Sequence, residues 1–232
     1  MQLNELLREL FSDDYEINYQ GDVVAGTGTI DEQQVAIIGT TAHATIGIET
    51  ALLLAQHVLT VVRSHPGRPI LLLVDTQGQR LSRRDELLGA HGYLAHLSKC
   101  LEVARKQGHY LVSLVYGEGV SGGFLSFGMM ADEIHALPDA QIRVMDLPAM
   151  ARVMKIPLER LQALSASSPV FAPGIENFLR LGGVDSIWPH RLSNHLRTAL
   201  KRAQEHGKYE QARTGRRQLA DNVIKRVRED SA

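Results

Sequence analysis

The chain has little cysteine and no long apolar segment, and both absences narrow the kind of protein it encodes. Its single cysteine, Cys100, excludes an internal disulfide and is typical of a reducing compartment. The longest apolar stretch, 51–62, is interrupted by Gln56 and His57, so no span of about 20 apolar residues can form a transmembrane helix. The first residues lack the charged-then-apolar layout of a signal peptide. We therefore expect a soluble, cytoplasmic protein that does not enter a membrane.

A net charge near zero conceals two regions of opposite sign. Residues 1–190 carry 14 Lys/Arg against 21 Asp/Glu, a net −7, whereas residues 191–228 carry 11 against 3, a net +8. The basic segment has one aromatic residue, Tyr209, and no recognised motif, so nucleic-acid binding is not predicted. Arg213, Arg216 and Arg217 in this segment are candidates for binding a phosphorylated ligand or an acidic partner protein. A solvated helix face, or one neutralised by the acidic body of the chain, explains the same charges equally well.

The hydrophobic pattern predicts an α/β fold. With 232 residues, 44% of them hydrophobic, and with no low-complexity linker or exact repeat, we expect residues 1–232 to form one domain with a sizeable core. Strands are predicted at 23–30, 34–40, 70–74, 110–116, 133–137 and 141–145, the first two as a hairpin. Helices are predicted at 3–10, 47–63, 82–106, 148–153, 157–164, 175–181, 191–206 and 208–228. In the helix at 47–63, Ile48, Leu52, Ala55 and Leu59 are expected on one buried face.

The most informative segment is 117–123, which reads GEGVSGG and lies between an apolar strand-like run and an apolar helix-like run. Its glycines allow a sharp turn that leaves backbone N–H groups uncovered at a helix start, where the helix dipole also favours negative charge. A second glycine-bearing loop is predicted at 75–79, directly after the strand at 70–74. Ligands of α/β sheets gather beyond the carboxyl ends of such strands. The two loops are therefore predicted to face one site and to form an oxyanion hole from backbone N–H groups.

Two other interpretations of the glycine turn stay open from the residues alone. The turn matches the G-x-S-x-G nucleophile elbow of α/β-hydrolases, with Asp185 and His190 or His195 as later triad partners. These partners crowd near the C-terminus, and no HGGG-type segment lies upstream. The glycines could also serve only close helix–strand packing.

The candidate site residues follow from the anion-hole interpretation. The candidate catalytic residues are Gly78, Ser121, Gly122 and Gly123, and the candidate binding residues are Thr76, Gln77, Gly119, Val120, Arg213, Arg216 and Arg217.

Several polar residues near these segments have both a structural and a functional interpretation. We expect Ser121 to cap the following helix with its hydroxyl, Asp75 to cap its loop, and Glu118 to form a structural hydrogen bond. His91 is the histidine that we would test as a proton donor. The histidines His43, His91, His96 and His135 have no metal-ligand spacing, so no metal site is predicted. Arg143 and Arg152 are candidates for binding a carboxylate.

The order and spacing of these motifs resemble a known family. The two strand–loop units ILLLVDTQG (70–78) and GEGVSGG (117–123) are separated by one long helix and followed by ADEIHALPDAQI (131–142). This layout resembles the crotonase superfamily, and in particular the carboxyltransferase subunits of acyl-CoA carboxylases. The stretches VMDLP (144–148) and SPVFAPG (168–174) most closely resemble the gamma subunits of biotin-independent malonate decarboxylases. The resemblance extends over essentially the whole chain.

The resemblance implies a crotonase-like (ClpP/crotonase) spiral of ββα units with flanking C-terminal helices, and a heterodimer with a homologous beta subunit. It implies decarboxylation of malonyl-S-[acyl carrier protein] to the acetyl thioester and CO2 at the interface of these two subunits. It further implies an acyl carrier protein (delta) subunit with a phosphoribosyl-dephospho-CoA prosthetic group, and an alpha acyltransferase subunit. No cofactor is expected on this chain, and no biotin is expected in the reaction.

The sequence departs from the family pattern at Gln77, which stands where the carboxyltransferases usually have proline. The second crotonase-like half of a complete carboxyltransferase is also absent, and in the family it belongs to the partner. Two alternatives therefore stay open. The chain could be half of a biotin-dependent carboxyltransferase, or a non-catalytic scaffold subunit that docks the carrier protein.

Overall fold

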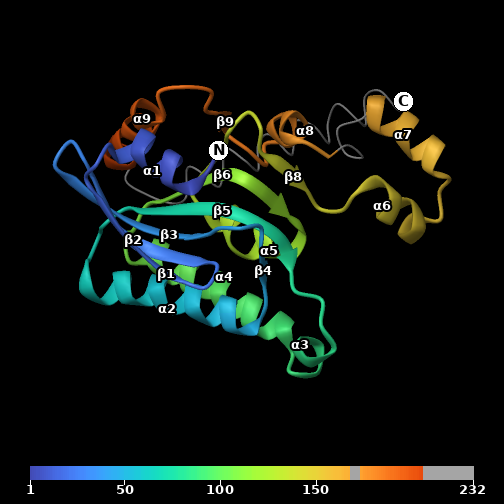
Figure 1. Ribbon diagram of the computed structural model, residues 1–232, viewed down its shortest axis with the longest axis horizontal. Coiled ribbons are helices and arrows are strands. Elements are labelled where there is room, and N and C mark those ends of the chain that lie inside the picture. Colours follow the sequence, from blue (N-terminus) through green and yellow to red (C-terminus); the bar gives the residue numbers. More distant parts are fainter. Residues whose placement is uncertain (168–172, 206–232) are drawn as a thin grey trace.

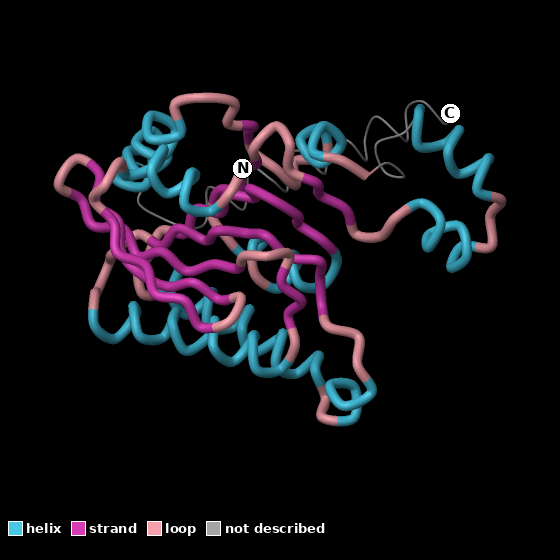
Figure 2. Tube along the Cα trace, in the orientation of Figure 1, coloured by secondary structure: helices cyan, strands magenta, loops and turns pink. Residues whose placement is uncertain are grey.

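The computed structural model describes residues 1–167 and 173–205, and Figures 1 and 2 show them as a twisted sheet with helices on both faces. The strands are β1 (Tyr15–Gln20), β2 (Val23–Ile30), β3 (Gln33–Thr40), β4 (Ala44–Ile46), β5 (Ile70–Gln79), β6 (Leu111–Val120), β7 (Glu133–Ala136), β8 (Gln141–Arg143) and β9 (Ser186–Ile187). The helices are α1 (Leu3–Phe11), α2 (Ile48–Ser64), α3 (Arg83–Leu87), α4 (Ala90–Lys106), α5 (Ser121–Ser126), the 3-10 turn η1 (Gly128–Met130), α6 (Leu147–Met154), α7 (Leu158–Ser167), α8 (Ile175–Arg180) and α9 (Leu192–Glu205).

The sheet changes from antiparallel to parallel along its width. Its strand order is β1-β2-β3-β5-β6-β7-β9, with β4 paired to β5 and β8 paired to β6. Strands β1, β2 and β3 pair antiparallel, and every pairing from β3 onward is parallel. Helices α2 and α4 connect the central parallel strands, which places the carboxyl ends of β3, β5 and β6 at one edge of the sheet.

The central strands are apolar because both of their faces are covered. Along β5, Ile70, Leu72 and Val74 pack into the core beneath α2 and α4. The alternate residues Leu71 and Leu73 pack into a second core beneath α1 and α9. Figure 1 shows the two helical layers on opposite sides of β5 and β6.

A partly exposed ionic network fastens α9 to the sheet. Arg202 binds both carboxylate oxygens of Glu133, at 2.7 and 2.5 Å, and Tyr110 and His135 also hydrogen-bond this carboxylate, at 2.6 and 3.0 Å. Burial alone raises the pKa of Glu133, but the hydrogen bonds from Arg202, His135 and Tyr110 outweigh it and hold the pKa far below its ordinary value. The indole of Trp188 stacks on His135 and completes this corner of the fold.

Most of the predicted elements are confirmed, and the differences have local causes. The hairpin at β2–β3 and the helix α2 form as expected, but the helix predicted at 82–106 is two helices, α3 and α4, because the chain is left-handed at Gly89 with φ of 74°. The helix predicted at 208–228 lies outside the described residues. Cys100 is a buried core residue with its pKa raised by burial. Leu52 was wrongly placed on the buried face of α2, since its side chain is 43% exposed while Ala51 and Leu54 are buried. The strand at Tyr15–Gln20 was missed because its side chains are mostly exposed and lack an apolar run.

Two helices lie apart from the sheet. Figures 1 and 2 show α6 and α7 as an arm extending beyond β8, and α6 buries none of its side chains. Within residues 1–167 and 173–205, no helix is both long and apolar enough to span a bilayer.

Candidate active site

The two glycine-bearing segments lie side by side, but they are not the loops that the sequence predicts. Strand β5 continues through Gln79 and β6 continues through Val120, so 75–79 and 117–120 are strand residues. Helix α5 begins directly at Ser121. The prediction that the segments converge is confirmed, because a Cβ added to Gly123 would lie 2.7 to 2.9 Å from the backbone of Gly78. Only glycine permits an approach this close.

Ser121 does not cap the helix as predicted. The N-cap residue is Val120, and no side-chain cap hydrogen bond forms there. Ser121 instead occupies the first helical position with φ of 49°, a left-handed conformation that is uncommon for a residue with a side chain. Among the described residues its hydroxyl has no hydrogen-bond partner. It is therefore available to a ligand.

The serine-hydrolase partners are engaged elsewhere. Asp185 accepts a hydrogen bond from the N–H of Ile134 at 2.7 Å, and His195 stacks on Trp188. Neither side chain contacts Ser121 within the described part of the chain. The geometry of a Ser-His-Asp triad is absent there.

Two of the predicted anion donors, the N–H groups of Gly122 and Gly78, already have acceptors within the protein. The N–H of Gly122 donates to Oε1 of Gln79 at 2.9 Å. The N–H of Gly78 donates to Oγ1 of Thr76 at 3.1 Å, and the Thr76 hydroxyl in turn donates to the carbonyl of Ala44 at 2.7 Å. The Gly78 N–H is thus used within the fold. The oxygen that accepts the Gly122 N–H, in contrast, belongs to the Gln79 side chain, which can move. A ligand oxygen that displaces the Gln79 amide can therefore accept the Gly122 N–H.

The remaining predicted residues of β5 and β6 are chain neighbours of Gly78 and Ser121. Gly119 is buried and Val120 half-buried at the end of β6, and the Gln77 side chain is exposed on β5. The neighbouring Arg80 is held by Asp85 at 2.7 Å and by Glu49 at 2.5 Å, which fixes the end of β5.

Glu49 is the shared acceptor of this ionic cluster. Its own backbone N–H at the start of α2, together with Arg84 and Arg80, lowers the pKa of Glu49 to about 2. The carboxylate therefore stays charged at neutral pH and keeps both guanidinium groups in place beside the end of β5.

A bulge separates the regular part of the sheet from the glycine segments. Val74 pairs with Val115, but Thr76 pairs with Gly119, so β6 carries two more residues than β5 between these pairs. Bulges of this kind are common next to active sites because they redirect backbone and side-chain groups. The bulge frees the N–H of Glu118, which donates to Oδ1 of Asp75 at 2.9 Å. Asp75 therefore fastens the bulge, rather than capping a loop as predicted.

Asp75 also binds a histidine from another part of the chain. Nδ1 of His43 lies 2.9 Å from Oδ1 of Asp75, and the backbone N–H of His43 donates to Oδ2 at 2.9 Å. The Asp75 side chain is 7% exposed and the His43 side chain 57%. The sequence pointed to His91 instead, which is exposed near the start of α4. The signal that favours His43 is its position in the chain, because it closely follows the carboxyl end of β3, where α/β sheets bind ligands.

Glu118 forms the structural contact that was expected, with Arg143. Its Oε1 lies 3.3 Å from Nη2 of Arg143, while Oε2 is buried without a partner in the described residues. The carboxylate-binding role suggested for Arg143 is thus met by a carboxylate of its own chain. Arg152 is exposed on α6.

A cavity of about 360 Å³ opens at this edge of the sheet. It is lined by Asp75, His43, Gly117 and Glu118, together with residues of the first turn of the chain and of the segment 139–141. The cavity lies at the carboxyl ends of β3, β5 and β6, the position where α/β sheets bind ligands.

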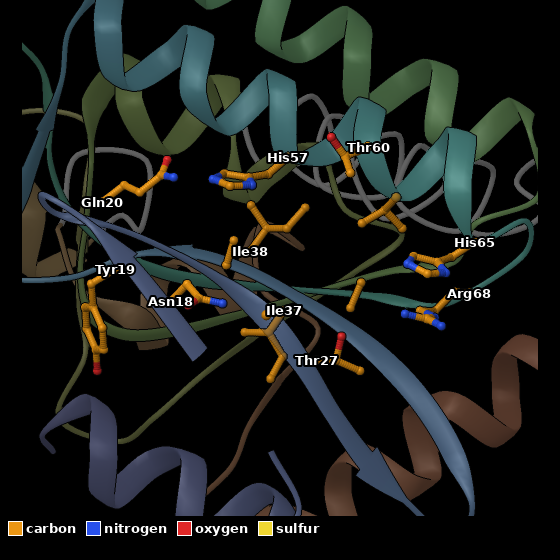
Figure 3. Close-up of a pocket in the computed structure, with 14 residues that line it drawn as sticks. Asn18, Tyr19, Gln20, Thr27, Ile37, Ile38, His57, Thr60, His65 and Arg68 are labelled. Carbon is orange, nitrogen blue, oxygen red and sulfur yellow. The ribbon is translucent and has the colours of Figure 1, made fainter. Parts of the chain in front are cut away.

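A second cavity, of about 460 Å³, lies between α2 and the strands β1, β2 and β3. Figure 3 shows His57 on α2 facing the strands that carry Asn18 and Ile38. Burial lowers the pKa of His57 from its ordinary value. None of the predicted site residues that the structure describes lines either cavity, although Gly117 and Glu118 of the glycine turn line the first one.

Two expectations concern groups beyond these cavities. Arg213, Arg216 and Arg217 fall outside the described residues. Within the described ranges, no group of three or more His, Cys, Asp or Glu residues is placed to bind a metal ion.

The architecture is that of the crotonase-like carboxyltransferases. The Pseudomonas malonate decarboxylase MdcD–MdcE hetero-dimer contains a chain that matches with a TM-score of 0.74 at 25% identity, covering 98% of both chains. A Pseudomonas malonate decarboxylase hetero-tetramer in complex with coenzyme A gives a TM-score of 0.76 at 24% identity, covering 97% of each chain.

Sequence comparison narrows the class to one family. Residues 41–231 match the family model of the malonate decarboxylase gamma subunit, and the chain belongs to this family. A curated relative, the malonyl-S-ACP:biotin-protein carboxyltransferase MADD of Malonomonas rubra, is 34% identical over 184 residues. That alignment covers 71% of this chain and 63% of the relative, so the chain spans less than two thirds of that protein's length.

Proposed function

We propose that this chain acts with a homologous beta subunit to decarboxylate a malonyl thioester carried on an acyl carrier protein, giving the acetyl thioester and CO2. The observation that carries the proposal is the family match over 191 of 232 residues, which includes both glycine segments. The likeness to a chain of the MdcD–MdcE hetero-dimer over nearly its full length supports it.

The protein must stabilise an enolate oxygen and then allow the enolate carbon to be protonated. When the C–C bond to the carboxylate breaks, its electron pair passes into the thioester and creates an enolate oxygen. Hydrogen-bond donors already in position lower the energy of that charge, and one such donor contributes roughly 10²–10³-fold to kcat. The enolate carbon must then take up a proton. Neither step needs a protein nucleophile.

The Gly122 N–H is the donor best placed for the first task. It already donates to an amide oxygen, Oε1 of Gln79, at 2.9 Å. A carbonyl or enolate oxygen has the same acceptor chemistry and can take that place when the amide swings aside. Ser121, with its unpartnered hydroxyl at the adjacent position, supplies a second donor. Gly123 lets α5 pack directly against the backbone of Gly78, which holds Ser121 and Gly122 beside the end of β5.

In the proposed complex, the other subunits supply the parts of the active site that this chain lacks. The beta subunit supplies the second crotonase-like half, the delta subunit carries the substrate on a phosphoribosyl-dephospho-CoA group, and the alpha subunit transfers the acyl group. No biotin takes part. Arg213, Arg216 and Arg217 provide positive charge for the carrier protein or its phosphorylated group.

The deciding experiment co-purifies the chain with its beta subunit and measures CO2 release from malonyl thioester with and without avidin. Equal rates with and without avidin are expected. Inhibition by avidin would contradict the biotin-independent reaction and favour the second candidate, half of a biotin-dependent carboxyltransferase. The name of the Malonomonas relative is the specific observation behind that alternative.

A scaffold role is tested within the intact complex. A Cβ at Gly122 would lie 2.9 Å from Oε1 of Gln79, so Gly122→Val covers the N–H donor and should lower kcat about 10²-fold. Gly92→Val is the matched control, because a Cβ at that helical glycine meets no atom within 4 Å beyond its own stretch of helix backbone. Unaltered turnover of the Gly122 variant would favour a chain that only shapes the interface.

The basic segment has its own test. Charge reversal at Arg213, Arg216 and Arg217 should raise KM for the carrier substrate while the complex still assembles. An unchanged KM would remove the segment from the binding surface.

A further inference from the structure

His43 is held in an unusual backbone conformation beside the glycine segments. Ala42 and His43 have φ of 56° and 53° and form the centre of a turn in which the Ala44 N–H donates to the carbonyl of Thr41 at 3.2 Å. Two consecutive positive φ values normally call for glycine or asparagine. Each such residue costs roughly 1–2 kcal/mol. Strain of this kind persists where surrounding contacts enforce it, and it is frequent at active sites.

The Asp75 carboxylate holds the turn and also determines which nitrogen of the His43 ring faces solvent. The Asp75 carboxylate accepts a hydrogen bond from the backbone N–H of His43 at 2.9 Å, and its Oδ1 lies 2.9 Å from Nδ1 of the ring. Because a carboxylate oxygen can only accept, its closeness to Nδ1 favours the tautomer that carries the proton on Nδ1 and leaves Nε2 to exchange protons with its surroundings. The ring is 57% exposed, so Nε2 is accessible.

The pair is joined to the glycine turn by a direct hydrogen bond. The same oxygen of Asp75 that binds Nδ1 also accepts the Glu118 N–H at 2.9 Å. A Cβ at Gly117 would overlap this carboxylate, so the glycine there makes room for it. His43, Asp75, Gly117 and Glu118 all line the cavity of about 360 Å³.

No other described histidine combines these properties. His135 also pairs with a carboxylate, but its side chain is only 1% exposed. His57 faces the other cavity and has no carboxylate partner among the described residues. Only at His43 does an accessible ring meet a buried carboxylate within the described chain.

We propose that His43 is the proton-transfer residue of the decarboxylation, oriented by Asp75; this role rests on the proposed function. After CO2 leaves, the electron pair of the broken C–C bond resides in the thioester enolate. The enolate carbon forms a C–H bond with the proton on Nε2 of the His43 imidazolium, and that N–H bond breaks. Asp75 holds the ring in position, with its Oδ1 2.9 Å from Nδ1 and its Oδ2 bound to the backbone N–H of His43. Solvent returns the proton to Nε2.

The test uses the intact complex with the beta subunit and the variant His43→Asn. Asparagine tolerates positive φ and can still donate to Asp75, so the turn is preserved. The control is His65→Asn, an exposed histidine that follows α2 at the opposite end of β5. Two rates are measured: CO2 release from malonyl thioester, and exchange of the acetyl thioester methyl protons in D2O, which is the protonation step run in both directions.

The His43 variant should lose both rates by about 10²-fold or more, with KM unchanged and with partial rescue by added imidazole. The control should keep both rates. Wild-type rates in the His43 variant would overturn the proposed role while leaving the decarboxylase assignment intact. A wild-type complex that releases no CO2 would instead refute the proposed function, and the role of His43 with it.

Discussion

Replacing Gly123 by alanine tests whether the two glycine segments must touch. The added Cβ would lie 2.7, 2.8 and 2.9 Å from three backbone atoms of Gly78. Ordinary carbon contacts lie near 3.5–4.0 Å, so the segments must separate by roughly 1 Å. Overpacking of this kind costs about 1–3 kcal/mol. Alanine recovers about 0.5–1 kcal/mol of it in a helix, which leaves a net loss of about 1–2 kcal/mol.

The neighbouring glycine provides the matched control. At Gly122 the added Cβ meets only the end of the Gln79 side chain, at 2.9 Å, and that end can move. Gly122→Ala loses one hydrogen bond, worth about 1 kcal/mol, and gains a similar amount of helix propensity. Its stability should therefore stay within about 0.5 kcal/mol of the wild type.

Urea unfolding followed by far-UV circular dichroism measures both variants, and thermal melting provides a second readout. For a protein of this size, the Tm should fall by roughly 2–8 °C in Gly123→Ala and stay nearly constant in Gly122→Ala. If the two variants lost equal stability, or if Gly123→Ala were as stable as the wild type, close approach would not be the reason for glycine at position 123.

Three further predictions follow from single contacts. Because the folded-state pKa of Glu133 is depressed, its stabilisation is present above the unfolded pKa near 4.3 and is lost as pH falls toward the folded value. Glu133→Gln should flatten the acid side of the Tm–pH curve, and an unchanged slope would show that the pair with Arg202 does not stabilise the fold. Gln79→Ala removes the acceptor that an incoming oxygen must displace, so KM for the thioester should fall by up to about fivefold; a higher KM would mean that the amide helps to bind substrate. Gly117→Ala would place a methyl group against the carboxylate of Asp75 and should cost about 1–3 kcal/mol in urea unfolding, with wild-type stability as the contrary result.

Local sequence patterns account for much of the fold. The run Ile70–Val74 had to be a strand covered on both faces, since each of its alternate residues is apolar, and both faces are indeed buried. The glycines at 117–123 also predicted a strand-to-helix transition, which the structure has at Ser121. Strand β1 escaped prediction because its exposed side chains carry no hydrophobic period.

The contents of the candidate site depended on contacts between distant residues. His43 and Asp75 are 32 positions apart, and Gly122 and Gln79 are 43 apart. Neither pair shares a local motif. The bulge that turns the Glu118 N–H toward Asp75 arises from the register of β5 against β6, which no residue pattern within one strand specifies.

The sequence by itself determined the α/β class, the two apolar central strands and the glycine turn, because hydrophobic period and glycine content act over a few neighbouring residues. The motif order was also sufficient to indicate the family. Only the tertiary structure decided which groups the turn meets. The Gly122 N–H meets an amide oxygen, the Ser121 hydroxyl has no hydrogen-bond partner among the described residues, and Asp75 lies against a histidine. Those outcomes depend on strand register and on the path of the chain after β3, where packing of remote segments overrides local preference.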